Sequence, residues 1–260
     1  MTYRLAVVGG GNMGAALVGG LLQAGWSPTD IAVVEVVAAR ADAVRDMFPG
    51  VDVVDSVPSC DAAVIAVKPY DVASATASAT SAGAARILSI AAGVTLAALE
   101  SAAGDAVVVR AMPNTPALVG EGAAAIAGGV GATDDDMAWA ESILGAVGTV
   151  VRVPESHLDA VTGLAGSGPA YVFMVAEALI DAGVHAGLTR PTAESLVTQL
   201  LVGSAALLRE RGDASALRAM VTSPGGTTAA GLRVLEQRAV RAAFVDAVAA
   251  ATARSIELGS

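Results

Sequence analysis

The sequence predicts an α/β protein in which a parallel sheet covered by helices, residues 1–153, is followed by an all-helical domain, residues 154–260. Up to about Val153, short apolar runs alternate with Ala-rich segments, whereas only long helical patterns follow Pro154. The short runs are apolar at every position rather than at every second one, which is typical of strands buried on both faces of a parallel sheet. The order of elements therefore indicates two domains of different class.

Six runs rich in Val and Ile are the predicted strands. They are residues 5–8, 31–34, 51–54, 62–67, 86–90 and 107–111. The second domain is predicted to contain helices at about 169–186, 191–209, 224–237 and 239–257, with Pro169 and Pro191 at helix-starting positions. These helices are apolar around much of their circumference, so we expect a partner subunit to cover them.

Composition argues against several classes of protein. With 54% hydrophobic and 15% charged residues, the 260-residue chain can bury a large core and is not expected to be disordered. The net charge of -10, with no cluster of Lys and Arg, argues against a nucleic-acid partner. The single cysteine, Cys60, cannot form an internal disulfide, so a cytoplasmic location fits best.

No metal site is expected. His157 and His185 are far apart and have no Cys or second His at ligand spacing, so both are interpreted as helix residues. The acidic run Asp134–Asp136 follows Thr133 and precedes an apolar helical pattern. Acidic residues in the first turn of a helix complement its dipole, and we interpret the run in that way.

The uncharged run from Leu5 to Thr29 has the length of a signal peptide or a membrane anchor. Several glycines and Asn12 lie within it, and they weaken any single helix through the run. Elsewhere, charged, polar or Pro residues interrupt the apolar stretches before they reach the length of about 20 residues that a spanning helix needs. We therefore expect no membrane partner.

The first predicted strand runs directly into Gly9–Gly14, with the letters GGGNMG, and an amphipathic helix follows. This order of strand, GxGxxG and helix is typical of a Rossmann-type dinucleotide site. Gly9 allows the tight turn, Gly11 lets a pyrophosphate approach the backbone, and Gly14 lets the helix pack closely on the strand. The N–H groups and the dipole at the helix start stabilise the phosphates, so no basic side chain is needed.

The second predicted strand is followed by Glu35, about 20 residues after the glycines, where a carboxylate usually accepts a hydrogen bond from the ribose 2′-OH. Glu35 therefore mildly favours NADH over NADPH. Two alternatives stay open: Arg40 can bind a 2′-phosphate if Glu35 turns away, and Glu35 can be a solvated loop carboxylate. The cofactor is accordingly expected to be NADPH or NADH.

Three further loops follow predicted strands: AVKP at 66–69, AAGVT at 91–95 and RAMPNTP at 110–116. Open α/β sheets bind ligands at the carboxyl ends of their strands, so these loops are expected to line the nicotinamide side of the site. Their candidate cofactor contacts are Val67, Lys68, Pro69, Ala92, Met112, Pro113 and Asn114.

Two motifs in the second domain, GSGPAYVF at 166–173 and SPGGTT at 223–228, complete a set that extends over essentially the whole chain. In order and approximate spacing, the set resembles the pyrroline-5-carboxylate reductase family. The resemblance implies a Rossmann-type domain followed by a helical dimerisation domain, with active sites formed between subunits. It also implies reduction of 1-pyrroline-5-carboxylate to L-proline, the last step of proline biosynthesis, by NADPH or NADH.

The same resemblance assigns residues. Those that hold the cofactor pyrophosphate are Val8, Gly9, Gly10, Gly11, Asn12 and Met13, and those at the nicotinamide half are Val67, Lys68 and Ala92. Those that hold the substrate run from Ser223 to Thr228, with Thr227 and Thr228 nearest to it. One segment departs from the family: 209–215 is RERGDAS where the family often has a His-Pro-Gly turn, so Glu210 and Asp213 are not assigned to the site.

The substrate loop also has suitable chemistry of its own. Ser223, Gly225 and Gly226 precede a helix expected to begin near Thr227, so backbone N–H groups and threonine hydroxyls can converge on a carboxylate. If the imine binds already protonated, the enzyme positions the ring and stabilises charge without a general acid. Thr228 is then the candidate partner of the imine nitrogen. Lys68 is a second candidate, for proton delivery or electrostatics, unless its amine lies in solvent.

Two other interpretations stay open. A Rossmann reductase of the hydroxyacid dehydrogenase or imine reductase type usually carries a lysine on a long interdomain helix, but no lysine follows Pro154. A non-catalytic dinucleotide-sensing dimer would keep the glycine loop and would not need SPGGTT. The pattern therefore favours an oxidoreductase that acts on a C=N bond.

Overall fold

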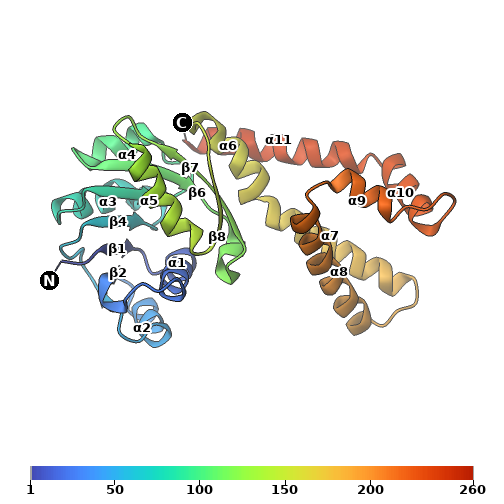
Figure 1. Ribbon diagram of the computed structural model, residues 1–260, viewed down its shortest axis with the longest axis horizontal. Coiled ribbons are helices and arrows are strands. Elements are labelled where there is room, and N and C mark those ends of the chain that lie inside the picture. The colour runs from blue at the N-terminus through green and yellow to red at the C-terminus, as the bar shows by residue number, and fades with distance from the viewer. Residues whose placement is uncertain (1, 260) are drawn as a thin grey trace. The chain divides into compact units, whose positions relative to one another are not determined.

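The computed structural model describes residues 2–259, which form one α/β unit and one helical unit (Figure 1). Residues 2–167 and 249–259 pack together as the first unit, and Gly168–Val248 form the second. The last turns of helix α11, Val240–Gly259, belong to the first unit, where buried Ser255 donates from Oγ to Asp159 Oδ1 at 2.7 Å. The sequence predicts a domain boundary between residues 153 and 154, whereas packing divides the chain after Ser167. The boundary at 153 stays a prediction.

The first unit is built on an eight-stranded sheet with the order β3-β2-β1-β4-β5-β6-β7-β8. Its strands are β1 (Leu5–Val8), β2 (Ile31–Val34), β3 (Asp52–Val54), β4 (Ala62–Ile65), β5 (Arg86–Ser89), β6 (Val107–Met112), β7 (Gly122–Gly128) and β8 (Gly148–Arg152). β1 to β6 are parallel, whereas β7 is antiparallel to β6 and β8 is parallel to β7. The six predicted strands are confirmed with small shifts at their ends, and β7 and β8 are additional.

Helices connect most of these strands. They are α1 (Asn12–Gln23), α2 (Ala38–Met47), α3 (Val72–Ser81), α4 (Leu96–Ala103), α5 (Asp134–Gly145) and α6 (Leu158–Val161), with the short turns η1 (Pro28–Asp30), η2 (Pro69–Asp71), η3 (Thr115–Val119) and η4 (Glu155–His157) and the π-helical η5 (Thr162–Gly166). The uncharged run after Arg4 forms β1, the glycine loop and α1, so it is not one continuous helix. Among residues 2–259, no group of three or more His, Cys, Asp or Glu side chains is placed to hold a metal ion.

The parallel strands carry apolar side chains into two separate cores. In β1, Leu5 and Val7 join one core, whereas Ala6 and Val8 join the other, because successive side chains of a strand point to opposite faces. Helices α1, α2 and α5 supply the first core, and helices α3 and α4 supply the second. The sheet is therefore a middle layer between two layers of helices, and its strand ends are left accessible to a ligand.

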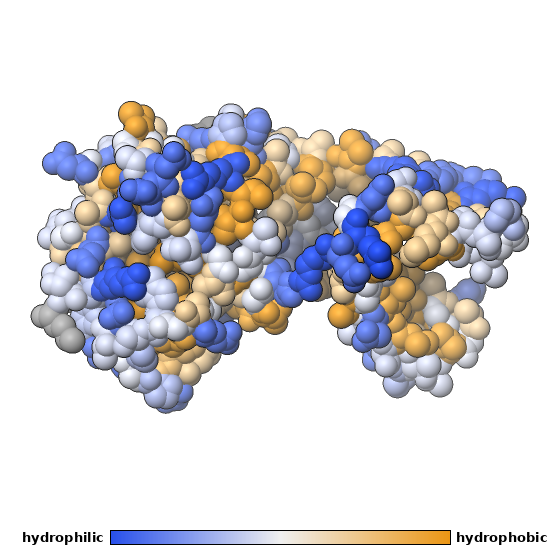
Figure 2. All heavy atoms as spheres, in the orientation of Figure 1, coloured by the Kyte–Doolittle hydropathy of each residue, from blue (hydrophilic) through white to orange (hydrophobic). Residues whose placement is uncertain are grey.

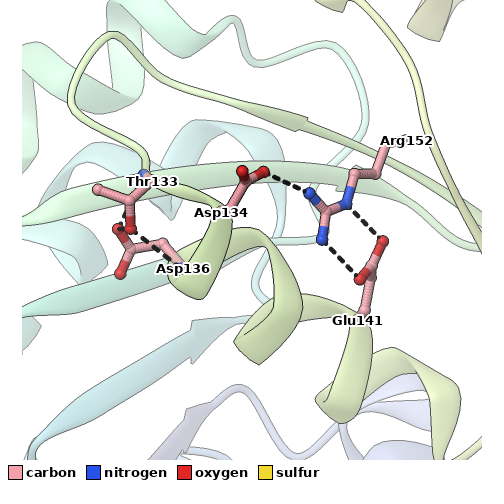
Figure 3. A network of polar contacts seen from close by, with 5 residues as sticks. All are labelled: Thr133, Asp134, Asp136, Glu141 and Arg152. Atoms are coloured by element: carbon pink, nitrogen blue, oxygen red, sulfur yellow. Dashed lines mark hydrogen bonds and ion pairs between the residues drawn. The ribbon is translucent and has the colours of Figure 1, made fainter.

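The acidic run forms the first turn of α5, as the sequence predicts, and Thr133 is the N-cap of that helix (Figure 3). Thr133 Oγ1 accepts from Asp136 N at 3.3 Å, while Asp136 Oδ2 accepts from Thr133 Oγ1 at 2.6 Å and from Thr133 N at 2.9 Å. These hydrogen bonds, chiefly that of the hydroxyl, hold the pKa of Asp136 below its usual value. Arg152 on β8 pairs with both Asp134 and Glu141, at 2.9 Å and 2.7 Å. The run therefore fixes α5 against the sheet.

The second unit contains helices α7 (Gly168–His185), α8 (Arg190–Arg211), α9 (Ala214–Met220), α10 (Thr227–Gln237) and the first part of α11. The four predicted helices form, and α9 is additional. Its N-cap is Asp213, whose carboxylate accepts from Ser215 N at 2.9 Å and from Ala216 N at 3.0 Å. The Asp213 carboxylate therefore stabilises the start of α9.

Large apolar side chains of the helical unit are exposed, and Figure 2 shows them in orange over its surface. Phe173 and Met174 on α7 are each 63% exposed, and Leu196, Leu200 and Val202 on α8 are also exposed. Within Gly168–Val248, Ala193 and Val197 are the buried residues. So much exposed apolar surface on one unit is typical of an interface with another subunit.

One helical stretch, Glu155–His185, is apolar and long enough to cross a membrane by length and composition alone. Only 6% of its most apolar window is buried, and its part from Gly168 on belongs to the exposed apolar surface of the helical unit described above. The stretch also contains Asp159, which holds Ser255 in the first unit. We therefore attribute its hydropathy to a subunit interface.

Candidate functional site

A cavity of about 710 Å³ lies at the carboxyl ends of β1, β2, β4 and β5. The strand order β2-β1-β4-β5 brings together loops that are far apart in the sequence. Many of the predicted cofactor residues line it: Val8, Gly9, Gly11, Asn12, Met13, Glu35, Val67, Lys68, Pro69 and Ala92. The predicted dinucleotide site and the observed cavity therefore coincide.

The three glycines of GxGxxG have different steric roles. Gly9 has a φ of +114°, and a Cβ there would lie 2.5 Å from the Ala66 carbonyl oxygen. A Cβ on Gly14 would lie 2.0 Å from the Gly9 carbonyl oxygen. By contrast, a Cβ on Gly11 would have no heavy atom within 4 Å, and Gly11 lines the cavity. The geometry thus supports a tight turn at Gly9, close packing at Gly14 and an open backbone at Gly11.

The start of α1 fits the phosphates of a dinucleotide. Gly11 is the N-cap of α1, and no side chain caps the helix there. Asn12 and Met13, in the first turn, line the cavity. The N–H groups and the dipole of this turn are therefore available to an anion without any basic side chain.

Glu35 lies at the cavity wall directly after β2 and is only 8% exposed, so it is not a solvated loop carboxylate. Its Oε2 accepts from Gly10 N at 3.1 Å, and its Oε1 accepts from Val37 N at 2.8 Å. Arg40 also lines the cavity, and its Nε lies 3.5 Å from Glu35 Oε2. The backbone therefore holds the carboxylate at the wall, with the guanidinium beside it.

Of the predicted cofactor residues, Gly10 and Gly14 of the glycine loop do not line this cavity, and neither do three at the end of β6, Met112, Pro113 and Asn114. Asn114 is nearly buried, and its side chain is used by the backbone: Nδ2 donates to Ala165 O at 3.0 Å, and Oδ1 accepts from Ala123 N at 2.8 Å. These bonds tie β7 and η5 to the loop after β6. The assignment of the three residues to the cofactor stays a prediction.

Further residues line the cavity beyond those predicted as contacts: Val34, Val36, Ala66, Tyr70, Asp71, Ile90 and Ala91. Val36 directly follows Glu35, and Tyr70 directly follows Pro69. Their nearness in sequence to predicted site residues at strand ends is the signal that could have identified them as cavity residues. Their exposure, 78% for Val36 and 82% for Tyr70, follows only from the fold.

The predicted substrate loop, Ser223–Thr228, belongs to the helical unit and leads into α10. Gly225 has a φ of +72°, and Gly226 N donates to Ser223 O at 3.1 Å, which closes a turn. Gly226 is the N-cap of α10, and no side chain caps the helix there. The loop therefore offers first-turn N–H groups and two threonine hydroxyls at a helix start, which is suitable for a carboxylate.

Cys60 is buried and takes no part in the cavity. Burial, with a smaller effect from the charge of Asp61, raises the pKa of the Cys60 thiol to about 11. A thiol with such a pKa stays protonated at neutral pH, and the thiolate is the nucleophilic form. Cys60 is therefore a core residue and not a nucleophile.

Comparisons with known proteins follow the same two-part division. Residues 155–258 match a family model described as pyrroline-5-carboxylate reductase dimerisation, and residues 4–93 match one described as NADP oxidoreductase coenzyme F420-dependent. A pyrroline-5-carboxylate reductase of Mycobacterium tuberculosis is 44% identical over 285 residues, which cover 98% of this chain and 96% of that protein.

Two solved structures are similar over nearly the whole chain. One is a pyrroline-5-carboxylate reductase from Coxiella burnetii, with a TM-score of 0.93, 35% identity and full coverage of both chains. The other is a Plasmodium falciparum pyrroline carboxylate reductase with NADP bound, with a TM-score of 0.85 and 30% identity over 99% of this chain and 98% of that one.

Proposed function

Since the chain belongs to the pyrroline-5-carboxylate reductase family, we propose that it reduces 1-pyrroline-5-carboxylate to L-proline, the last step of proline biosynthesis. It is an NAD(P)H-dependent oxidoreductase that acts on a C=N bond. The observation that carries the proposal is the presence in one chain of a cavity lined by the glycine loop and of the loop Ser223–Thr228. A non-catalytic dinucleotide sensor would need only the first of these features.

In this reaction bound NAD(P)H supplies a hydride to the imine carbon. We propose that the substrate binds as an iminium, whose nitrogen already carries its proton, so that no general acid is needed. Backbone N–H groups of Gly225, Thr227 and Thr228 hold the substrate carboxylate, while Gly226 N donates to Ser223 O and closes the turn. The Thr228 hydroxyl oxygen accepts a hydrogen bond from the iminium N–H.

Lys68 is the second proposed catalytic group. It lies in the loop after β4, lines the cavity and is exposed. Its ammonium group would act on the cofactor side of the reaction, by electrostatics or by supplying a proton when the imine arrives neutral.

The proposed function is tested by following oxidation of NADH and of NADPH by absorbance, with 1-pyrroline-5-carboxylate as substrate and proline measured as product. We expect turnover that depends on the imine substrate with at least one of the two cofactors. Cofactor binding without any turnover, under conditions in which a related reductase is active, would favour the dinucleotide-sensing interpretation and contradict the proposal.

For the choice of cofactor, we propose that both are used and that NADH is mildly favoured. Glu35 is held at the cavity wall, where a free lone pair can accept from a ribose 2′-OH, while Arg40 can offset its charge when a 2′-phosphate binds.

The Arg40→Ala variant should lose about tenfold in kcat/KM with NADPH and about twofold or less with NADH. Arg45→Ala, which removes the same charge from α2 outside the cavity, is the matched control. Equal losses with both cofactors would exclude a 2′-phosphate role for Arg40.

For partners, we propose a homo-oligomer assembled through the helical domain 154–260. The exposed apolar surface of α7 and α8 supports it, as does the dimerisation model that matches residues 155–258. Sedimentation equilibrium at assay concentration should give at least twice the 25.4 kDa of one chain. A stable monomer with full activity would contradict the assembly.

We further propose that the protein is cytoplasmic and has no membrane or nucleic-acid partner. The net charge of -10 and the single buried cysteine support this proposal.

A further inference from the structure

Tyr70 is a large aromatic residue whose side chain the fold leaves unburied. It lies in η2, in the connection between β4 and α3, lines the cofactor cavity and is 82% exposed. A tyrosine that served the core would be buried, and α3 begins only at Val72, so Tyr70 is not needed in an apolar helix face. An exposed aromatic ring at a cavity is instead available to a ligand.

A second exposed apolar side chain lines the same cavity. Val36, directly after Glu35, lines the same cavity and is 78% exposed. In the sheet β1 lies between β2 and β4, so Val36 and Tyr70 follow the two strands that flank the glycine loop. A ligand whose phosphates lie on that loop therefore has an apolar side chain available on either side.

The residues that line the cavity indicate which part of a dinucleotide would contact these side chains. The phosphates fit Gly11 and the start of α1, and the carboxylate of Glu35 fits a ribose hydroxyl. The remaining group on the Glu35 side is the adenine base, a flat ring with apolar faces and a polar edge. Bases stack on tyrosine with little regard to the base's hydrogen-bonding pattern.

We propose that Tyr70 stacks on the adenine ring of the bound cofactor, with Val36 packing on the adenosine from the β2 side. Tyr70 is in this view a positioning residue for the reaction and has no part in proton transfer. The proposal rests on the proposed use of NAD(P)H, and it adds a residue that neither the glycine loop nor the strand-end carboxylate predicts.

The test uses Tyr70→Ala and Tyr70→Phe in the full chain, with calorimetric Kd values for NADH and initial-rate kinetics with 1-pyrroline-5-carboxylate. Tyr70→Ala should raise the Kd and KM for NADH about tenfold and leave kcat within about twofold, whereas Tyr70→Phe should stay close to wild type. Reduced nicotinamide mononucleotide, which lacks adenosine, is the second probe. Its KM should be the same in Tyr70→Ala and wild type.

Val130→Ala, at a site 97% exposed and away from the cavity, is the control for removing an exposed apolar side chain. An unchanged Kd for NADH in Tyr70→Ala would overturn the stacking role. Equal losses with NADH and with the mononucleotide would also overturn it, because they would place Tyr70 at the nicotinamide half. Absence of turnover in the wild type would overturn the proposed reaction alone, since the Kd for NADH would still report on Tyr70.

Discussion

Replacing Gly14 by alanine should weaken binding of NADH at least about 100-fold, because the phosphates would lose several charge-assisted hydrogen bonds at the start of α1. The new Cβ would lie 2.0 Å from the Gly9 carbonyl oxygen, far inside contact distance. Gly9 cannot move aside, since a φ of +114° and the nearby Ala66 carbonyl already constrain it. Helix α1 would therefore be displaced from β1, and the free energy of unfolding should fall by about 1–3 kcal/mol.

Variants at two other glycines distinguish the effect of helix packing from the effect of phosphate binding. Gly11→Ala should weaken NADH binding with little change in Tm, because its Cβ meets only the cavity. Gly145→Ala, near the end of α5 and also in open space, should leave NADH binding unchanged and raise stability slightly, by about 0.5–1 kcal/mol. Calorimetric Kd values and thermal unfolding of all three variants measure both effects. Normal NADH affinity in Gly14→Ala would refute the steric argument.

The parallel part of the sheet and the glycine loop were predictable because each leaves a local signal. β1 and β2 are buried at every position, and their unbroken apolar runs record that burial directly in the sequence. The glycine pattern is equally local, since Gly9 and Gly14 contact each other within one turn and its helix. The capping of α5 by Thr133 and Asp136 is a third case of neighbours in sequence interacting in the fold.

Strand β7 shows where the local signal ends. Its residues, GAAAIAG, have low β-propensity, and only Ile126 among them is β-branched. It forms because β6 and β8 supply hydrogen-bonding partners on both sides and because Ala125, Ile126 and Ala127 are buried in the two cores. Tertiary contacts therefore override a weak local preference, which a single sequence does not record.

Within the site, the sequence predicts at which strand ends the residues lie, but it does not predict which hydrogen bonds their side chains make. Glu35 was placed at the strand end, but its hydrogen bond to Gly10 N joins residues that are 25 positions apart and depends on the turn between them. The side-chain amide of Asn114 donates to Ala165 O and accepts from Ala123 N, and both partners lie beyond η3 in the chain. Contacts of this kind depend on topology and not on spacing.

The Thr228→Val variant should lower kcat about 10- to 100-fold, because valine keeps the shape of threonine and removes the oxygen that accepts from the iminium N–H. This hydrogen bond orients the iminium carbon toward the hydride donor, and its loss misplaces the reacting carbon, so kcat should fall more than the substrate KM rises. Thr228→Ser retains the hydroxyl and should recover most of the activity. Initial rates with 1-pyrroline-5-carboxylate, at saturating NADH, measure both constants.

The matched control is Thr222→Val, which removes a hydroxyl that donates to the Arg218 carbonyl at 2.6 Å and lies just outside the substrate loop. It should stay close to wild type. A second readout separates hydrogen bonding from acid catalysis: if Thr228 only holds an iminium, the pH profile of kcat/KM should keep its shape in Thr228→Val and fall uniformly. A profile that loses one limb would show instead that Thr228 takes part in proton transfer. Full activity in Thr228→Val would remove it from the reaction and leave the carboxylate-binding N–H groups of α10 as the function of the loop.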